Sequence, residues 1–294
     1  MNVAVIDVGS NSVRLLVANV RDGRVAQLHR DRVYVRLGDD AYRLRRISSS
    51  KLDETRAVAR RFARVAREHA VERLETIVTA PGRQSSNNEH LVDVLVRSTR
   101  APVVLLGADD EGRLAWEGAV ARMDDPPGVV AVVDLGGGSC EIAVGTPGVG
   151  PCWVRSRDAG ALRMTKALFP DGPPSARRLD AARAEVRRVL GKLDPPQPDV
   201  AVAVGGTARA IGRLAGKRYG GKELEKLAKT IARKGPHAAV RGSGITDDRA
   251  ETLLGGTLVL AEVARLLDSR LEVGRGGLRE GAALELARAD AAVA

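Results

Sequence analysis

Cysteine, aromatic residues and long apolar runs are all scarce in this sequence. The two cysteines, Cys140 and Cys152, have no C-x-x-C spacing and no accompanying histidine cluster, which excludes a disulfide framework and a zinc site of the usual pattern. Aromatic residues make up 2% of the 294 residues, so the core must be built from Val, Leu, Ile and Ala. No apolar run approaches the roughly 18 residues that a membrane span needs and no secretory signal is recognisable, so we expect a soluble cytoplasmic protein that does not bind membranes.

Two common phosphate-binding loops are missing as well. No Gly-Lys pair is followed by Ser or Thr, which excludes a P-loop, and no G-x-G-x-x-G occurs, which excludes the dinucleotide-binding fingerprint. A phosphate site, if there is one, must use another kind of glycine turn.

Positive charge is what the sequence has in excess. Lys and Arg number 47 against 37 Asp and Glu, which gives a formal net charge of +10. Such a charge favours a polyanionic partner, which could be nucleic acid, a phosphate polymer or a nucleotide, and it equally suits a solvated basic surface. The content of 44% hydrophobic and 29% charged residues is typical of a globular protein.

The pattern of strands and helices starts twice along the chain. Residues 3–20 predict a strand, a Gly/Ser/Asn turn and a returning strand, a third strand follows, and helices then alternate with strands. Pro126, Pro127 and Gly128 mark a boundary, after which the same order begins again. We therefore predict an α/β protein of two duplicated domains, residues 1–124 and 125–294, and leave open that the last helix packs back on the first domain.

Each half opens on an aspartate placed before a glycine turn: "AVIDVGSNS" contains Asp7, and "VVDLGGGSCE" contains Asp134. Glycines let backbone N–H groups approach phosphate oxygens, and Ser and Asn add donors. An acid beside a bound phosphate requires a divalent cation between them, for which Mg²⁺ is suited. The other interpretation is a pair of ordinary hairpin turns capped by Asp. Because the two turns occupy equivalent positions, we favour a phosphate-and-metal cleft between the domains.

Three stretches, "AVIDVGSNSVRLLVANV", "VVDLGGGSCEIAVG" and "VAVGGTARAIGRL", together resemble the phosphate motifs and the third glycine motif of the exopolyphosphatase and guanosine pentaphosphate phosphatase (Ppx/GppA) family. "GADDEGRLAWEGAV" and "GLREGAALELA" are similar to two further segments of that family, in the family's order. The resemblance implies two actin-like, ribonuclease H-like domains with an active-site cleft between them, as in actin and the sugar kinases.

The resemblance also implies roles for particular residues. Glu111 is expected to be the catalytic base that activates water; alternatively it stabilises a helix N-terminus. Asp7, Asp134 and Glu141 are expected to hold Mg²⁺, with Mn²⁺ as a substitute, although Glu141 could be a surface cross-strand charge. The phosphate-binding set is expected to be Gly9, Ser10, Asn11, Ser12, Arg83, Gly136, Gly137, Gly138 and Ser139. Arg83 could otherwise be one more surface arginine.

Two further groups are expected to bind more distant parts of the substrate. Gly205, Gly206 and Thr207 stand where a strand meets a helix N-terminus, which suits a nucleotide or a distal phosphate, or simply caps the helix. A basic run is expected either to follow a long polyphosphate chain or to form a solvated helix face. Its members are Arg213, Lys217, Arg218, Lys222, Lys226 and Lys229.

From these expectations we predict a hydrolase of phosphoric anhydrides. The first hypothesis is a Mg²⁺-dependent exopolyphosphatase; the others are a guanosine pentaphosphate 5′-phosphohydrolase, a non-hydrolysing sensor of polyphosphate or guanosine tetra- or pentaphosphate, and, more remotely, a sugar kinase. We expect a homodimer without a specific nucleic-acid partner. Cys140 stands where the family commonly has Thr, and a Gly in "GRGGLREG" stands where Asp is frequent. None of His29, His69, His90 and His237 is followed by Asp, so we expect no counterpart of the HD-type module of longer relatives.

Overall fold

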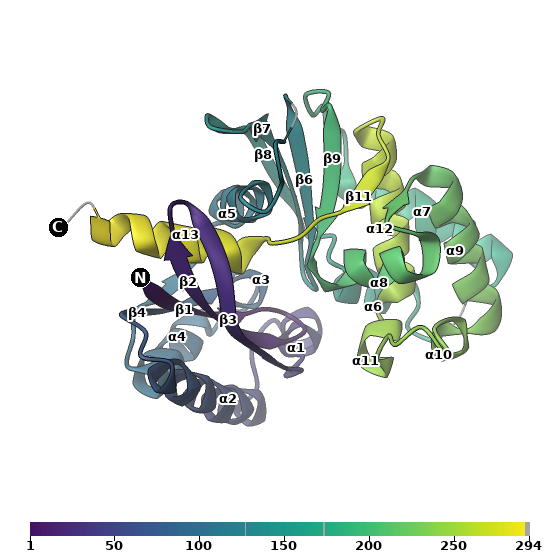
Figure 1. The fold of residues 1–294 in the computed structure, drawn as a ribbon. Coiled ribbons are helices and arrows are strands. Elements are labelled where there is room, and N and C mark those ends of the chain that lie inside the picture. Colours follow the sequence, from purple (N-terminus) through teal and green to yellow (C-terminus); the bar gives the residue numbers. More distant parts are fainter. Residues whose placement is uncertain (127, 173, 292–294) are drawn as a thin grey trace. The chain divides into compact units, whose positions relative to one another are not determined.

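The structure, a computed structural model, describes residues 1–126, 128–172 and 174–291 and divides into two compact units. Unit 1 comprises Met1–Asp124 together with the residues from Gly276 onward, and unit 2 comprises Asp125–Arg275. The last helix therefore belongs to unit 1. Figure 1 shows the helices and strands of both units.

Unit 1 is built on a five-stranded mixed sheet with the strand order β3-β2-β1-β4-β5. Strands β1, β2 and β3 form an antiparallel meander, and β4 and β5 continue the sheet parallel to β1. The strands are β1 (Asn2–Val8), β2 (Val13–Arg21), β3 (Arg24–Val33), β4 (Arg73–Val78) and β5 (Val103–Leu105). The helices are α1 (Leu37–Leu44), α2 (Ser49–Glu68), α3 (Ala80–Arg83), α4 (Asn88–Thr99), α5 (Ala108–Val120) and α13 (Leu278–Ala291).

Helices cover both faces of this sheet. On one face α2 and α4 pack over Ala4, Ile6 and Val17, with Phe62 of α2 fully buried between them. On the other face α5 and α13 pack over Val3 and Val5 (Figure 1). Because β1 is central and covered on both sides, its sequence is a nearly continuous apolar run, which is typical of a buried strand.

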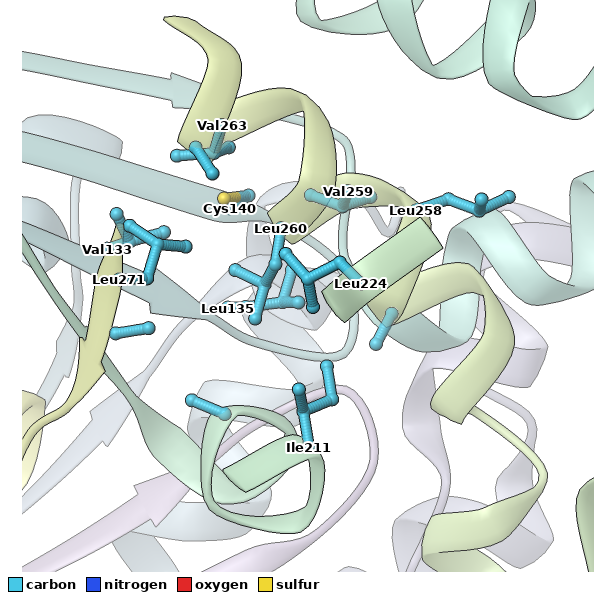
Figure 2. Packing of buried hydrophobic residues seen from close by; sticks show 14 of the residues in the cluster. Val133, Leu135, Cys140, Ile211, Leu224, Leu258, Val259, Leu260, Val263 and Leu271 are labelled. Atoms are coloured by element: carbon cyan, nitrogen blue, oxygen red, sulfur yellow. The ribbon is translucent and has the colours of Figure 1, made fainter. Parts of the chain in front are cut away.

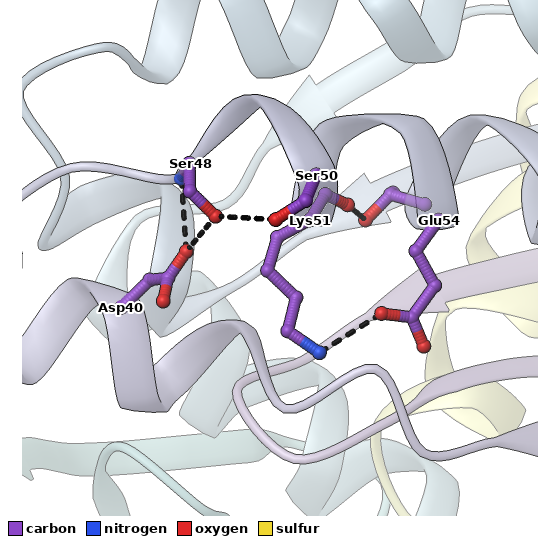
Figure 3. A network of polar contacts seen from close by, with 6 residues as sticks. Asp40, Ser48, Ser50, Lys51 and Glu54 are labelled. Atoms are coloured by element: carbon purple, nitrogen blue, oxygen red, sulfur yellow. Dashed lines mark hydrogen bonds and ion pairs between the residues drawn. The ribbon is translucent and has the colours of Figure 1, made fainter.

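A small polar network connects α1 to the start of α2. The backbone N–H and the hydroxyl of Ser48 both donate to Asp40 Oδ2, at 2.9 and 2.5 Å, and Lys51 pairs with Glu54 one turn into α2 (Figure 3). Asp40 thus satisfies an N–H at the beginning of α2 that has no partner within the helix. The network fixes α1, a helix that the sequence pattern did not predict, against the longest helix of the unit.

Unit 2 repeats the same plan. Its six-stranded sheet has the order β10-β11-β9-β6-β7-β8, in which β6, β7 and β8 form an antiparallel meander and β9 and β11 run parallel to β6. The strands are β6 (Val130–Leu135), β7 (Cys140–Thr146), β8 (Gly150–Arg157), β9 (Val200–Val204), β10 (Arg218–Tyr219) and β11 (Leu271–Val273). Taken from β8, this order matches that of unit 1, so the prediction of a duplicated α/β fold is confirmed.

The helices of unit 2 enclose one large apolar core. Val259, Leu260 and Val263 of α12 pack towards Val133, Leu135 and Leu271 of the sheet (Figure 2). The helices are α6 (Ala161–Leu168), α7 (Ala176–Leu190), α8 (Gly205–Ala215), α9 (Gly221–Lys234), α10 (Pro236–Ala239), α11 (Asp247–Ala250) and α12 (Leu253–Leu266). Residues 247–266 form two helices, α11 and α12, and not one continuous helix.

Candidate functional site

The first glycine turn, Gly9–Ser12, joins β1 to β2 and is held by backbone hydrogen bonds. Gly9 N donates to Ser12 O at 3.2 Å, which closes the turn. From the start of α1, Arg36 N donates to Asn11 O at 3.1 Å and Gly38 N donates to Ser10 O at 2.7 Å. These bonds occupy the carbonyl groups of the turn, so its side chains and N–H groups are what a ligand would meet.

Two side chains of this turn are buried without a hydrogen-bond partner in the described part of the chain: Ser10 Oγ and Asn11 Nδ2. Ser10 is 3% exposed and Asn11 is 5% exposed. A buried polar group that lacks a partner costs about 1–3 kcal/mol, so such groups are uncommon unless a ligand or water satisfies them. A hydroxyl and an amide N–H together can donate to two oxygens of a phosphate group.

Asp7, at the end of β1, lies opposite Arg14 in the β1–β2 register. Its Oδ2 is 3.7 Å from Arg14 Nη1, and Arg14 Nε donates to Ser12 Oγ at 3.0 Å. The carboxylate therefore anchors an arginine beside the turn. Asp7 was expected to hold Mg²⁺, a role that stays a prediction, and the observed ion pair gives the buried carboxylate a partner of its own.

Arg279, in the first turn of α13, lies near the same turn. Its Nη1 is 3.5 Å from Leu15 O on β2. Burial lowers the pKa of Arg279, and the neighbouring positive charge of Arg14 lowers it further, while Glu280 and Asp7 oppose that shift. Sequence reasoning assigned no role to Arg14 or Arg279, although both stand in the quoted motifs, because nothing in the sequence indicated that the two would lie together.

Glu111 and Arg83 are brought together. Glu111 lies in the first turn of α5 and is 6% exposed, and Arg83 at the end of α3 donates from Nη1 to Glu111 Oε2 at 2.8 Å. The same Nη1 donates to Leu106 O at 2.9 Å. Arg83 is therefore not simply a surface arginine, because it holds a buried carboxylate in position. The role of Glu111 as the catalytic base stays a prediction.

These groups share one edge of the unit 1 sheet. Strands β1, β4 and β5 are parallel neighbours; the glycine turn follows β1, Thr79 and α3 follow β4, and α5 follows β5. A Cβ placed on Gly9 would lie 3.8 Å from Thr79 Oγ1, so the first two of these segments are in contact. Ligands bind at the carboxyl ends of parallel strands in open α/β sheets. This edge carries the hydroxyl and amide donors of the first glycine turn, the guanidinium of Arg83 and the carboxylate of Glu111.

The second glycine turn, Gly136–Ser139, is held in the same way by the start of a short helix. Gly136 N donates to Ser139 O at 3.1 Å, and from α6 Ala161 N donates to Gly136 O at 2.9 Å. Gly160 packs so closely on the turn that a Cβ there would lie 2.3 Å from the Gly137 carbonyl. Both turns are thus fixed by an eight-residue helix that follows the third strand of a meander, and neither helix was predicted.

Asp134 and Glu141 face each other in the β6–β7 register. Glu141 is 1% exposed, and the hydroxyl of Ser156 on β8 donates to its Oε1 at 2.7 Å. Glu141 is therefore not a surface cross-strand charge. Burial, with the negative charges of Glu141 and Asp134, raises the pKa of the Cys140 thiol well above its ordinary value of 9.0. Cys140 thus remains protonated and is unsuited to act as a nucleophile.

The third glycine motif lies against Asp134. Gly205 begins α8 with a φ of +88°, and a Cβ there would lie 3.1 Å from Asp134 Oδ1. Arg249 of α11 is 7% exposed and donates from Nη1 to Thr207 Oγ1 at 3.0 Å. A helix N-terminus and a buried guanidinium together favour an anion. Sequence reasoning missed Arg249 because it lies 42 residues from its partner.

The residues of the predicted polyanion path are all exposed. Arg213 donates to Gly244 O at 2.7 Å, Arg218 is 3.5 Å from Glu272, and Lys229 is 3.1 Å from Glu225. Arg218 and Lys229 thus each have a carboxylate neighbour, and the role of the run with polyphosphate stays a prediction.

The donors of unit 2 suit a hard cation. Asp134 and Glu141 offer carboxylate oxygens on adjacent strands, and Mg²⁺ in proteins is usually bound by one or two carboxylates with substrate phosphates and water. Within the described residues no group of three or more His, Cys, Asp and Glu side chains is placed to hold a metal ion. The roles of Asp7, Asp134 and Glu141 with Mg²⁺ stay predictions.

None of the described helices is both long and apolar enough to cross a membrane.

Known proteins are similar to this chain in sequence and in fold. Exopolyphosphatase 2 of Mycobacterium tuberculosis is 29% identical over 319 aligned residues, which cover 97% of this chain and 98% of that protein. A Ppx/GppA family member of Aquifex aeolicus is 26% identical with a TM-score of 0.83 and covers 99% of this chain and 98% of its own.

A second solved structure, of an exopolyphosphatase-like protein, is 26% identical with a TM-score of 0.87 over 97% of both chains. The sequence of residues 16–289 matches the Ppx/GppA phosphatase family. With two duplicated actin-like units and the glycine turns in the family's order, this chain belongs to the Ppx/GppA phosphatase family.

Proposed function

We propose that this protein is an exopolyphosphatase, which releases orthophosphate from the end of inorganic polyphosphate by the attack of water. The observation that carries the proposal is the edge of the unit 1 sheet, where Glu111 is held by Arg83. At the same edge, the first glycine turn holds two buried donors, Ser10 Oγ and Asn11 Nδ2, for which the described residues provide no hydrogen-bond partner. The likeness to exopolyphosphatase 2 of Mycobacterium tuberculosis over nearly the whole chain supports the choice of substrate.

Each residue has a role that its surroundings suit. Ser10 and Asn11 donate to oxygens of the terminal phosphate, which supplies the partners that they lack in the described structure. Glu111 accepts the proton of the attacking water, and a positioned base of this kind contributes about 10²–10⁴-fold to the rate. Arg83 keeps the carboxylate in place and adds positive charge near the phosphate that is cleaved.

A divalent cation would be held in unit 2. Asp134 and Glu141 are the oxygen donors for Mg²⁺, or for Mn²⁺ in its place, and Ser156 orients Glu141 through its hydrogen bond. When bound, the ion would neutralise negative charge on the phosphate oxygens.

A second candidate substrate is guanosine pentaphosphate. The third glycine motif favours it, because the N-terminus of α8 and the buried Arg249 offer a site for a further phosphate or a ribose group. The chemistry at Glu111 would be the same, and the two substrates differ in what the third motif would bind.

The test is phosphate release by the full chain from short and long polyphosphates and from guanosine pentaphosphate, with and without Mg²⁺. Glu111→Gln should lose at least about a hundredfold in rate while it still binds polyphosphate. Asp110→Asn is the matched control, since Asp110 precedes Glu111 in the same helical turn and contacts Arg113 on the surface. Equal rates for wild type and Glu111→Gln would refute the assignment of the base. Binding without release by the wild type would instead indicate a sensor.

A further inference from the structure

Two histidines lie together at the edge of unit 1. His29 is in β3, the edge strand, and His69 follows the last residue of α2; their ring centres are 5.1 Å apart with the planes inclined by 41°. His29 pairs in register with Val17, which belongs to the core beneath α2. Asp31, two residues on, reaches Arg61 of α2 at 2.6 Å. The alternation of side chains along β3 therefore directs His29 towards α2.

The hydrogen bonding of His69 fixes its tautomer. Its Nδ1 lies 2.9 Å from Val65 O, and a carbonyl oxygen can only accept. Nδ1 must then carry the proton, so in the neutral ring Nε2 holds a lone pair. A backbone carbonyl that orients an imidazole in this way is the usual outer contact of a metal-binding histidine.

The ring of His29 has a buried atom that lacks a partner. Among the described residues nothing forms a hydrogen bond with His29 Nε2. Leaving such an atom unsatisfied costs free energy, which a bound ligand would recover. Two imidazoles on one tetrahedral ion, with metal–nitrogen distances of about 2.0–2.1 Å, have ring centres about 5 Å apart. The observed spacing matches that value.

We propose that His29 and His69 form a two-imidazole site for a late first-row divalent ion such as Zn²⁺, Ni²⁺ or Cu²⁺. Imidazole nitrogen suits these ions and does not suit Mg²⁺, so the site is independent of the proposed phosphate chemistry. No third His, Cys, Asp or Glu completes a cluster within the described residues, and water fills the remaining positions.

The charges around the pair are largely compensated. Arg61 is paired with Asp31, and Arg64 lies 3.7 Å from Glu68. Arg67 donates to Thr99 O at 2.6 Å and so points towards the end of α4. A bound ion would link the edge strand β3 to the end of α2, and unit 1 would be more stable with the ion than without it, because only the folded chain brings the two rings together.

The test is calorimetric titration of the chelator-treated full chain with Ni²⁺ and Zn²⁺ in a Cys152→Ser background, which removes the exposed thiol. We expect one equivalent of ion at micromolar affinity, an at least tenfold weaker affinity in His29→Gln and in His69→Gln, and no binding of Mg²⁺ at the same concentrations. His90→Gln and His237→Gln are matched controls on exposed histidines and should bind like the parent. Cu²⁺ electron paramagnetic resonance should show two nitrogen ligands in the parent and one in each variant.

Thermal unfolding provides a second measurement. Ni²⁺ should raise the Tm of the parent and of the two control variants, and it should leave the Tm of His69→Gln unchanged. His69 is the half-buried residue that caps the C-terminus of α2 and lies outside β3, so we expect that variant to fold. Equal affinity in the parent and His69→Gln, or no binding by the parent, would overturn the proposal.

Discussion

Arg83 donates a hydrogen bond to Glu111 over 2.8 Å, although 28 residues separate them. Arg83 ends a helix after β4, and Glu111 lies in the first turn of a helix after β5, so the contact exists because β4 and β5 are adjacent parallel strands. The candidate base is therefore positioned by the topology of the sheet.

Arg83→Ala should impair both catalysis and stability. Removal of the guanidinium leaves Glu111 buried without its ionic partner, which should cost about 1–3 kcal/mol of the free energy of unfolding, and polyphosphate hydrolysis should fall by at least tenfold. Arg83→Lys should recover part of the stability and less of the rate, since an ammonium lacks the planar fork. Urea denaturation and phosphate release measure the two effects. Arg97→Ala, on an exposed face of α4, is the control, and an Arg83→Ala protein as active as this control would contradict the prediction.

Ser10→Ala and Ser12→Ala should differ in their effects on the free energy of unfolding. Ser10 Oγ is buried and lacks a partner among the described residues, so its removal should leave the free energy of unfolding unchanged or raise it by about 1 kcal/mol. Ser12 Oγ accepts from Arg14, so its removal should lower stability. The KM for polyphosphate should rise in Ser10→Ala. A marked loss of stability in that variant would show that the hydroxyl has a structural role.

Ser156→Ala should weaken the response to Mg²⁺. Without the hydroxyl, Glu141 keeps its burial and loses a hydrogen bond at 2.7 Å, so the carboxylate should be less well oriented and the protein less stable by about 1–3 kcal/mol. Mn²⁺ binding followed by electron paramagnetic resonance, together with the Mg²⁺ concentration for half-maximal activity, measures the first effect. Ser156→Thr retains the hydroxyl and should restore both. Unchanged ion affinity in Ser156→Ala would argue against Glu141 as a ligand.

Gly160→Ala should distort the second glycine turn. The added methyl group would lie 2.3 Å from the Gly137 carbonyl, which is too close for any contact, so α6 and the turn must separate at a cost of about 1–3 kcal/mol. Gly221→Ala is the control, because no atom lies within 4 Å of a Cβ at that position. Chemical denaturation should show a lower free energy of unfolding for Gly160→Ala than for Gly221→Ala. Equal stability would show that the turn accommodates the methyl group without cost.

Cys140 should make stability fall at alkaline pH. Burial raises the pKa of its thiol above the ordinary value of 9.0 in the folded state. Below pH 9.0 the thiol is protonated in both the folded and the unfolded chain, so the free energy of unfolding does not depend on this group. As pH rises towards the folded pKa, only the unfolded chain releases the proton, and the free energy of unfolding falls. Denaturation of wild type and Cys140→Ala between pH 7 and about 10.5 measures the difference. If the free energy of unfolding depended on pH identically in wild type and Cys140→Ala, the prediction for the Cys140 thiol would be contradicted.

Alkylation of the native protein provides an independent check on this thiol. Cys152 is exposed and should react, whereas the buried Cys140 should react only after unfolding.

Local features of the chain were sufficient to predict much of this architecture. Apolar segments separated by turn residues identified the two meanders, and Asp7 and Asp134, each before a glycine turn, identified equivalent positions in the two halves. Both signals depend only on residues near one another in sequence. Helices α1 and α6 escaped prediction because they are eight residues long and are stabilised largely by the turns that they hold.

The sequence by itself determined the duplicated order of elements and the chemistry that its motifs can offer, because periodicity and turn composition act over a few residues. Tertiary structure decided which side chains meet. Arg83 with Glu111, Ser156 with Glu141, and Arg249 with Thr207 are separated by 28, 15 and 42 residues, and each pair depends on how the strands and helices are arranged around the sheet. Asp7 illustrates the difference: its position before a glycine turn was visible in the sequence, but its partner, Arg14, was identified only when β1 and β2 were seen in register.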